Sequence, residues 1–338
     1  MSRLIPITFL LSGTFCAIAQ DTNSSALPPF SMPATVQVRN VDIYSEGTRI
    51  SGTVFSDQAN AGKRLPTIVM AQGWGGTAVS LEREASAFAQ AGYLVLTFDY
   101  RGWGKSDSRI ILTSPREPSQ KNNWRYTAEV RALREVVAPL DFVMDWQNAI
   151  DFVVGDPQCD PNRLGLWGTS LSGGLVVSAA ERDPRVKAVH AQVPALEGRW
   201  VLATPKDRDE TRTEATKRAE GQLGYPEPGT RAIGLLGAPV RAQFASWFPV
   251  EDIVRIPNVA TQFVLAEKDT LVDNPTNGLR AYELAKGPKN LIVIPGINHF
   301  AIYQDPKARF QARDAAIAWF DKYVKGAGAQ AKAAAASR

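Results

Sequence analysis

Apolar and polar positions along the chain predict short buried strands that alternate with longer amphipathic helices. Near-continuous apolar runs predict strands over residues 66–73, 93–102, 163–168, 186–194, 260–269 and 290–296. Apolar positions at helical spacing predict helices over residues 80–92, 138–155, 174–183, 277–287 and 312–326. Strands without polar positions are typical of a sheet that is covered on both faces. The pattern therefore predicts an α/β fold with a mostly parallel central sheet flanked by helices on both faces.

Two stretches depart from this alternation. Residues 34–57 alternate apolar and polar positions around a turn at Glu46-Gly47, which predicts an antiparallel strand pair. Residues 195–250 contain no clear buried strand; they begin charged and helix-prone and end rich in glycine and proline. Long excursions from a compact domain are usually functional or disordered. We expect residues 195–250 to form a cap-like insertion that partly covers a site, with a plain surface excursion as the alternative.

Residues 1–19 have the features of a secretory signal peptide. Arg3 supplies a positive charge, the stretch from Leu4 onward is nearly uncharged, and Ala17-Ile18-Ala19 matches a small-x-small cleavage site. The apolar run is too short to span a membrane. We therefore expect cleavage after Ala19, a secreted or periplasmic protein, and no membrane span.

The rest of the chain divides into three parts of different composition. A polar, proline-rich lead-in covers residues 20–35, the main domain covers 36–325, and a low-complexity tail covers 326–338. Removal of the signal peptide leaves Cys159 as the only cysteine, so no intrachain disulfide can form. A domain of this size can be stabilised by its hydrophobic core alone.

Charge and composition narrow the functional classes. Hydrophobic residues make up 44% of the 338 residues and charged residues 21%, as in ordinary globular proteins. The net charge is +4, and Lys and Arg are scattered among Asp and Glu, which argues against nucleic acid as a partner. The sequence has no zinc-type His/Cys cluster and no phosphate-binding P-loop, so we expect neither a metal nor a cofactor.

Ser170 follows the strand predicted over residues 163–168 and directly precedes a helix. This setting is typical of a nucleophile elbow, a tight turn that holds a serine hydroxyl above the edge of a sheet. The usual pattern is G-x-S-x-G, and here Gly168 and Ser172 supply the two small residues around the turn. Ser172 is a minor alternative nucleophile, but that interpretation shifts the turn away from the strand end.

A histidine and a carboxylate lie on two further loops at strand ends. His299 follows the last predicted strand, whereas His190 sits in the middle of a strand, where a histidine is more often a core residue. Asp269 stands just past another strand, with Glu267 and Asp273 as competing carboxylates. A catalytic serine needs a base, and a histidine base needs a carboxylate to orient it. The order serine, aspartate, histidine favours Asp269, because α/β-hydrolases place their triad in this order.

A glycine-rich loop follows the first buried strand, and we call residues 71–77 the glycine loop. Acyl transfer requires two backbone N–H donors aimed at the developing oxyanion. We expect one donor from Leu171, next to the candidate nucleophile, and one from Trp74 in the glycine loop. The three glycines of this loop allow a close approach of the backbone. An ordinary glycine-rich turn is the alternative for this loop taken alone.

Five motifs together resemble the α/β-hydrolase superfamily, and more narrowly its dienelactone-hydrolase-like and acetyl-xylan-esterase-like branch. They are "QGWGGT", "LTFDYRGWGKSD", "LWGTSLSGG", "LAEKDTLVD" and "IPGINHF", and the likeness covers residues 36–324. The resemblance implies that Ser170 is the nucleophile, Asp269 the acid and His299 the base. The glycine loop of the family usually starts with His-Gly, whereas this chain has Gln72-Gly73.

The resemblance and the candidate triad predict a serine hydrolase that cleaves carboxylic esters of a small-molecule acyl substrate through an acyl-enzyme. A serine at the elbow argues against the dehalogenase and epoxide-hydrolase branches, which carry aspartate there. An amidase, peptidase or thioesterase with the same triad is the alternative, and a non-catalytic binding protein on this fold is an alternative of another class. We further expect Trp200, Trp247 and Phe248 of the insertion to contact substrate. The oligomeric state stays open.

Overall fold

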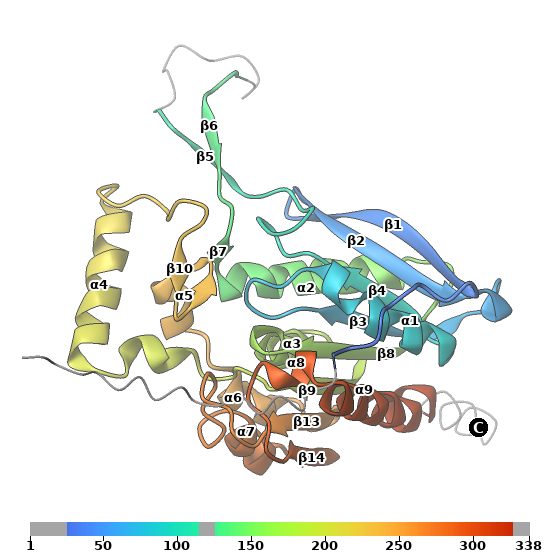
Figure 1. Cartoon of the computed structure of the whole chain (residues 1–338). Coiled ribbons are helices and arrows are strands. Elements are labelled where there is room, and N and C mark those ends of the chain that lie inside the picture. The colour runs from blue at the N-terminus through green and yellow to red at the C-terminus, as the bar shows by residue number, and fades with distance from the viewer. Residues whose placement is uncertain (1–25, 115–125, 327–338) are drawn as a thin grey trace, which may run out of the picture.

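A computed structural model describes residues 26–114 and 126–326 and is built around one eight-stranded sheet (Figure 1). The strand order is β1-β2-β4-β3-β8-β9-β13-β14. The strands are β1 Val36–Ser45, β2 Thr48–Asp57, β3 Leu65–Ala71, β4 Leu94–Phe98, β8 Cys159–Thr169, β9 Val186–Gln192, β13 Ala260–Ala266 and β14 Lys289–Ile294. Neighbouring strands from β4 to β14 run parallel, and β1, β2 and β4 pair antiparallel. The predicted, mostly parallel sheet is confirmed.

Helices cover both faces of the sheet, and the side chains of β3 mark the two faces. The covering helices are α1 Glu82–Gln90, α2 Pro139–Val154, α3 Leu171–Arg182, α7 Gly278–Leu284 and α9 Pro306–Phe320. Ile68 and Met70 pack in one core cluster with residues of α1 and α9. Val69 and Ala71 pack in the other, with residues of α2, α3 and α7. Because successive residues of a strand point to opposite faces, the two clusters lie on opposite sides of the sheet.

The first two strands form the predicted antiparallel pair. Ser45 pairs with Thr48, so the connection consists of Glu46 and Gly47 alone. Both residues have positive φ, 48° and 80°, as a two-residue type I′ hairpin turn requires. The alternation of apolar and polar residues in this stretch was therefore a correct indication of the hairpin.

Residues 195–250 form short elements beside the sheet rather than strands within it (Figure 1). They are a 3₁₀ turn Gly198–Leu202, α4 Pro205–Ala219, β10 Arg231–Ala232, β11 Leu235–Leu236, β12 Ala238–Pro239, α5 Arg241–Ala245 and α6 Pro249–Asp252. A capping box formed by Thr204 and Asp207 starts α4. A second outlying feature, which no pattern in the sequence indicated, is a two-stranded ribbon of β5 Ile110–Leu112 and β6 Val130–Ala132. In Figure 1 this ribbon projects away from the sheet.

The predicted signal peptide lies outside the described residues, as do the first part of the lead-in and the tail from residue 327. Over residues 26–114 and 126–326, no helix is both long and apolar enough to cross a membrane. In the same ranges no group of three or more His, Cys, Asp or Glu side chains is arranged to hold a metal ion. Cys159 is a buried free thiol at the start of β8.

Candidate active site

Ser170 occupies a sharp turn between β8 and α3. Its φ and ψ are 54° and −122°, a conformation that glycine adopts readily and other residues adopt at a cost. Its N–H donates to the carbonyl of Gln192 at 2.8 Å, and its own carbonyl accepts from Gly173 and Ala195, both at 2.9 Å. These bonds tie the turn to β9 and to the chain beyond it, so the strained backbone is held from both sides.

Gly168 and Ser172, the two small residues around the turn, are each explained by a different structural constraint. A Cβ on Gly168 would lie 2.2 Å from the carbonyl oxygen of Ser172, so only glycine fits there. Ser172 is fully buried, and its hydroxyl bonds to the Gln72 carbonyl and to the Tyr100 hydroxyl. The Ser172 hydroxyl is thus engaged between the glycine loop and the core, and the imidazole of His299 bonds to Ser170 instead.

The structure brings Ser170, His299 and Asp269 together from three different loops. Nε2 of His299 lies 3.0 Å from Oγ of Ser170, and Nδ1 lies 2.7 Å from Oδ2 of Asp269. The side chains of His299 and Asp269 are 3% and 0% exposed, so water does not compete for this contact. The other carboxylate oxygen of Asp269 accepts from the N–H groups of Leu271 and Val272 at 3.0 and 2.9 Å. The carboxylate is therefore held in one orientation toward the imidazole.

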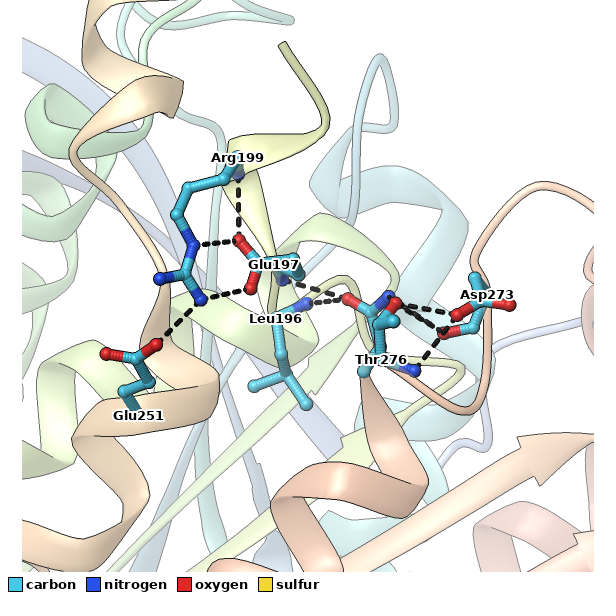
Figure 2. A network of polar contacts seen from close by, with 7 residues as sticks. Leu196, Glu197, Arg199, Glu251, Asp273 and Thr276 are labelled. Atoms are coloured by element: carbon cyan, nitrogen blue, oxygen red, sulfur yellow. Dashed lines mark hydrogen bonds and ion pairs between the residues drawn. The ribbon is translucent and has the colours of Figure 1, made fainter. Parts of the chain in front are cut away.

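The competing carboxylates and the second histidine have other contacts. Glu267 accepts from the N–H of Gly296 at 2.7 Å, and Asp273 accepts from the N–H of Thr276 at 2.9 Å (Figure 2). His190 lies in β9, where its Nδ1 is 2.7 Å from Gln262 Oε1. Burial lowers the pKa of His190 to about 4, which keeps its imidazole neutral. His190 is therefore a core residue, as the sequence indicated.

The glycine loop lies directly against Ser170. A Cβ on Gly73 would be 2.6 Å from the Cβ of Ser170, so only glycine allows this approach. Gln72 accepts from the N–H of Gly73 at 3.2 Å and donates to Ser80 at 2.8 Å, which fixes the start of the loop. Within the described part of the chain, the backbone N–H groups of Trp74 and Leu171 have no hydrogen-bond acceptor. Both predicted donors are thus available to a ligand.

A cavity of about 260 Å³ opens beside Ser170 and His299. The glycine loop forms one wall. Four other side chains complete the lining, and the sequence analysis did not select any of them: Leu235, Leu271, Phe300 and Tyr303. Phe300 directly follows His299 and Tyr303 comes four positions after it, so their closeness to the base in the sequence was the signal that could have found them.

Trp200, Trp247 and Phe248 do not line this cavity. The indole of Trp247 is 3% exposed and donates to Ser178 Oγ at 3.0 Å, deep against α3. Trp200 packs edge-on against the ring of Phe244, at 5.6 Å between ring centroids. Phe248 lies under the Arg199 guanidinium at 4.4 Å. These contacts place the three aromatic side chains in the packing of residues 195–250 and not at the candidate nucleophile.

The insertion reaches the site through a different contact. The indole N–H of Trp74 donates to the carbonyl of Leu236 at 2.9 Å, and the side chain of Leu235 lines the cavity. Arg199, near the start of the insertion, bonds to Glu197 and to Glu251, the residue that directly follows the insertion (Figure 2). An ion pair therefore links the beginning of the insertion to the residue after its end. The short strand β11 of the insertion contacts the glycine loop.

Comparison with known proteins gives the same architecture. The family model described as "Alpha/beta hydrolase family" matches residues 68–312. The quorum-quenching protein AidA of Acinetobacter baumannii is 36% identical over 159 residues. That match covers 47% of this chain and 45% of AidA, so the chain spans less than half of this relative.

Two solved structures are similar over most of the chain. The hypothetical protein PA2218 from Pseudomonas aeruginosa has a TM-score of 0.69 at 21% identity, with 87% of this chain and 96% of that chain covered. An acetyl xylan esterase from Paenibacillus sp. R4 has a TM-score of 0.58 at 19% identity, with 88% and 87% covered. These likenesses concern the fold and agree with the predicted resemblance to the acetyl-xylan-esterase-like branch. The chain belongs to the alpha/beta hydrolase family.

Proposed function

We propose that this protein is a serine hydrolase that cleaves carboxylic esters of small molecules through an acyl-enzyme. The observation that carries the proposal is the continuous line of contacts from Ser170 Oγ through the His299 imidazole to Asp269, at 3.0 and 2.7 Å. A nucleophile bonded to a base that a buried carboxylate orients is the arrangement acyl transfer needs.

In the first half of the proposed reaction, Oγ of Ser170 attacks the ester carbonyl carbon and its proton passes to Nε2 of His299. The carbonyl oxygen becomes an oxyanion, which accepts from the backbone N–H groups of Trp74 and Leu171. The carboxylate of Asp269 stabilises the imidazolium that forms. The tetrahedral intermediate then expels the alcohol, which takes the proton from His299 and leaves an acyl group on Ser170.

In the second half, His299 takes a proton from water while the water oxygen attacks the acyl carbon. The new tetrahedral intermediate breaks its bond to Oγ, and Oγ recovers the proton from His299. The product acid leaves and the free serine is restored. The protein groups in this cycle are three side chains and two backbone donors.

The lining of the cavity favours a neutral acyl group. Leu235, Leu271, Phe300 and the indole of Trp74 supply apolar surface, and among the described residues no Lys, Arg, Asp or Glu side chain lines this cavity. A buried charge without a partner is expensive, so an ionised acyl group would bind poorly. The same triad can also open amides and thioesters, and these remain the alternative substrates.

Fluorophosphonate labelling tests the nucleophile. We expect covalent labelling of Ser170, with tandem mass spectrometry assigning the adduct to it rather than to Ser172 in the same peptide. Ser170→Ala is expected to lower kcat/KM for p-nitrophenyl butyrate by about 10⁴-fold or more. Ser246→Ala, at an exposed serine of α5's end, serves as the control and should match the wild type. Full esterase activity in Ser170→Ala would show that Ser170 is not the nucleophile. Absence of labelling in the wild type would contradict the proposal that the protein is a serine hydrolase.

A substrate series tests the ester assignment. We expect kcat/KM to be highest for p-nitrophenyl esters and lower by an order of magnitude or more for anilides and thioesters with the same acyl group. Charged acyl groups such as succinyl should react more slowly than butyryl. A clear preference for the anilide or the thioester would replace the ester assignment with the corresponding alternative.

We also propose that the protein is exported. The support is the charged start, uncharged run and Ala17-Ile18-Ala19 site of the sequence. Expression of the full chain in a bacterium, followed by fractionation and N-terminal sequencing, should give a mature chain that starts at Gln20 outside the cytoplasm. An intact N-terminus in the cytoplasmic fraction would contradict export.

A further inference from the structure

Tyr303 lies beside the elbow although no motif in the sequence pointed to it. It belongs to α8 Ala301–Gln304, the single helical turn that follows His299. Its hydroxyl is 2.7 Å from Oγ1 of Thr169, the residue that precedes the candidate nucleophile. Its phenol lines the same cavity as Ser170 and His299. Arg309 donates to the carbonyl of Tyr303 at 3.1 Å, so the backbone that carries the phenol is also held.

The hydrogen bonds of Thr169 determine which way the phenol proton points. Thr169 is fully buried, and its Oγ1 already accepts from the amide of Gln192 at 3.1 Å. Its single proton then needs an acceptor, and among the described residues only the Tyr303 oxygen is bonded to this hydroxyl besides Gln192. A buried donor without an acceptor is unfavourable. Thr169 therefore donates to Tyr303, which leaves the phenol proton free for another acceptor.

The side chain of Ser170 is a candidate acceptor, because Ser170 follows Thr169 in the chain and lines the same cavity as the phenol. Burial raises the pKa of Tyr303 well above its usual value, and the side-chain hydrogen bond with Thr169 lowers it by less. The phenol thus stays protonated at any ordinary pH and can act as a donor. The ring of His299 stands edge-on to the phenol at 6.2 Å between centroids, and Nε2 of His299 lies 3.0 Å from Oγ of Ser170, so the phenol and the serine both border the imidazole.

We propose that the Tyr303 hydroxyl donates to Oγ of Ser170 and is a positioning residue for acyl transfer, an inference that rests on the proposed serine-hydrolase function. The chain of donors runs from Gln192 through Thr169 and Tyr303 to Ser170. Each group in it gives one proton and receives one, except the amide at its start.

The proposed hydrogen bond from Tyr303 to Oγ of Ser170 has a different strength in each state of the reaction. The oxygen of a free serine accepts well, whereas the same oxygen in an acyl-enzyme is an ester oxygen and accepts poorly. During deacylation the bond between the acyl carbon and Oγ breaks and His299 returns a proton to Oγ, so the departing oxygen accepts well again. An interaction that strengthens between ground state and transition state accelerates that step. Tyr303 therefore assists deacylation and has little effect on acylation.

Tyr303→Phe tests this inference because it removes the hydroxyl and keeps the ring. With an activated ester such as p-nitrophenyl butyrate, we expect the half-life of butyryl-Ser170 to lengthen about fivefold. This half-life is measured directly by quenching and intact-mass spectrometry. We expect kcat/KM and the rate constant for fluorophosphonate labelling to stay within twofold of the wild type, since both report attack by Ser170. When deacylation limits turnover, kcat and KM fall together.

Tyr100→Phe is the matched control. Its hydroxyl bonds to Ser172 and to the indole of Trp146 and does not line the cavity. We expect it to lower the melting temperature and to leave the acyl-enzyme half-life unchanged. The inference is overturned if Tyr303→Phe labels normally but deacylates at the wild-type rate, or if Tyr100→Phe slows deacylation equally. Failure of the proposed function itself would show differently, as normal ester turnover in Ser170→Ala.

Discussion

Replacing Ser170 with glycine is expected to stop ester hydrolysis and at the same time to make the fold more stable than replacing it with alanine. The reason lies in the backbone of the elbow, where φ is 54° and ψ is −122°. A side chain at such angles crowds the neighbouring peptide groups, and glycine has no Cβ to crowd them. Strain of this kind is typical of functional sites, where surrounding structure holds it in place.

The size of the effect follows from three contributions. Both variants lose the hydrogen bond between Oγ and Nε2 of His299, so this loss cancels in their comparison. Glycine relieves a strained conformation worth about 1–3 kcal/mol. It also gains about 0.4–1 kcal/mol of unfolded-state entropy relative to alanine, which opposes the relief. The free energy of unfolding of Ser170→Gly should therefore exceed that of Ser170→Ala by about 1 kcal/mol.

Urea unfolding followed by circular dichroism measures this difference, with alanine as the matched variant. For a domain of this size, a difference of about 1 kcal/mol corresponds to about 2 °C in Tm. Equal stability of the two variants, or a less stable glycine variant, would refute the argument that the elbow stores backbone strain. Both variants should be inactive toward esters, which keeps the stability measurement independent of ligand.

Two further predictions concern residues away from the triad. Trp247→Ala should lower the free energy of unfolding by about 3–5 kcal/mol, because its indole is 3% exposed and bonds to Ser178. Urea unfolding checks this, and the folded fraction should keep the wild-type acyl-chain preference; a changed preference at unchanged stability would contradict it. His190 should make the fold sensitive to acid, because its pKa of about 4 lies below the ordinary value of 6.5. Above pH 6.5 the imidazole is neutral in both the folded and the unfolded state. Below pH 6.5 the unfolded chain binds a proton that the folded protein does not bind, so the free energy of unfolding falls by about 2–3 kcal/mol between pH 7 and 4.5. Urea unfolding of His190→Asn, which keeps a donor for Gln262, should show a flatter pH dependence, and an unchanged one would refute the assignment to His190.

The order of strands and helices could be predicted from the sequence because parallel strands are buried on both faces. Each of β3, β4 and β13 is buried along its whole length, and each appears in the sequence as a near-continuous apolar run. Loops that leave the carboxyl ends of such strands meet at one edge of the sheet. The positions of Ser170, Asp269 and His299 after strands therefore predict that they lie at one edge of the sheet, and the choice of Asp269 over Glu267 and Asp273 further needs the serine, aspartate, histidine order of α/β-hydrolases.

The cavity wall could not be predicted in the same way. A count of aromatic residues says nothing about the direction in which each ring points. A Cβ on Gly174 would lie 2.8 Å from the ring of Trp247, so this indole fills a gap that a glycine of α3 leaves. The side chains at the cavity, such as Leu235, sit on two-residue strands and single turns. Their positions depend on long-range contacts, and the periodicity of apolar residues in the sequence does not predict such contacts.

The contacts of Trp74 explain how the insertion contributes to the site without placing its own tryptophans there. The Trp74 indole donates to the Leu236 carbonyl and stacks on the ring of Phe244, at 5.6 Å between centroids. Leu236 and Phe244 both belong to residues 195–250, and both hold the side chain of Trp74. The backbone N–H of Trp74 is one of the two proposed oxyanion donors. A donor must sit within a few tenths of an ångström of its working position to stabilise a transition state. The insertion therefore acts on the proposed reaction chiefly through the backbone of the glycine loop.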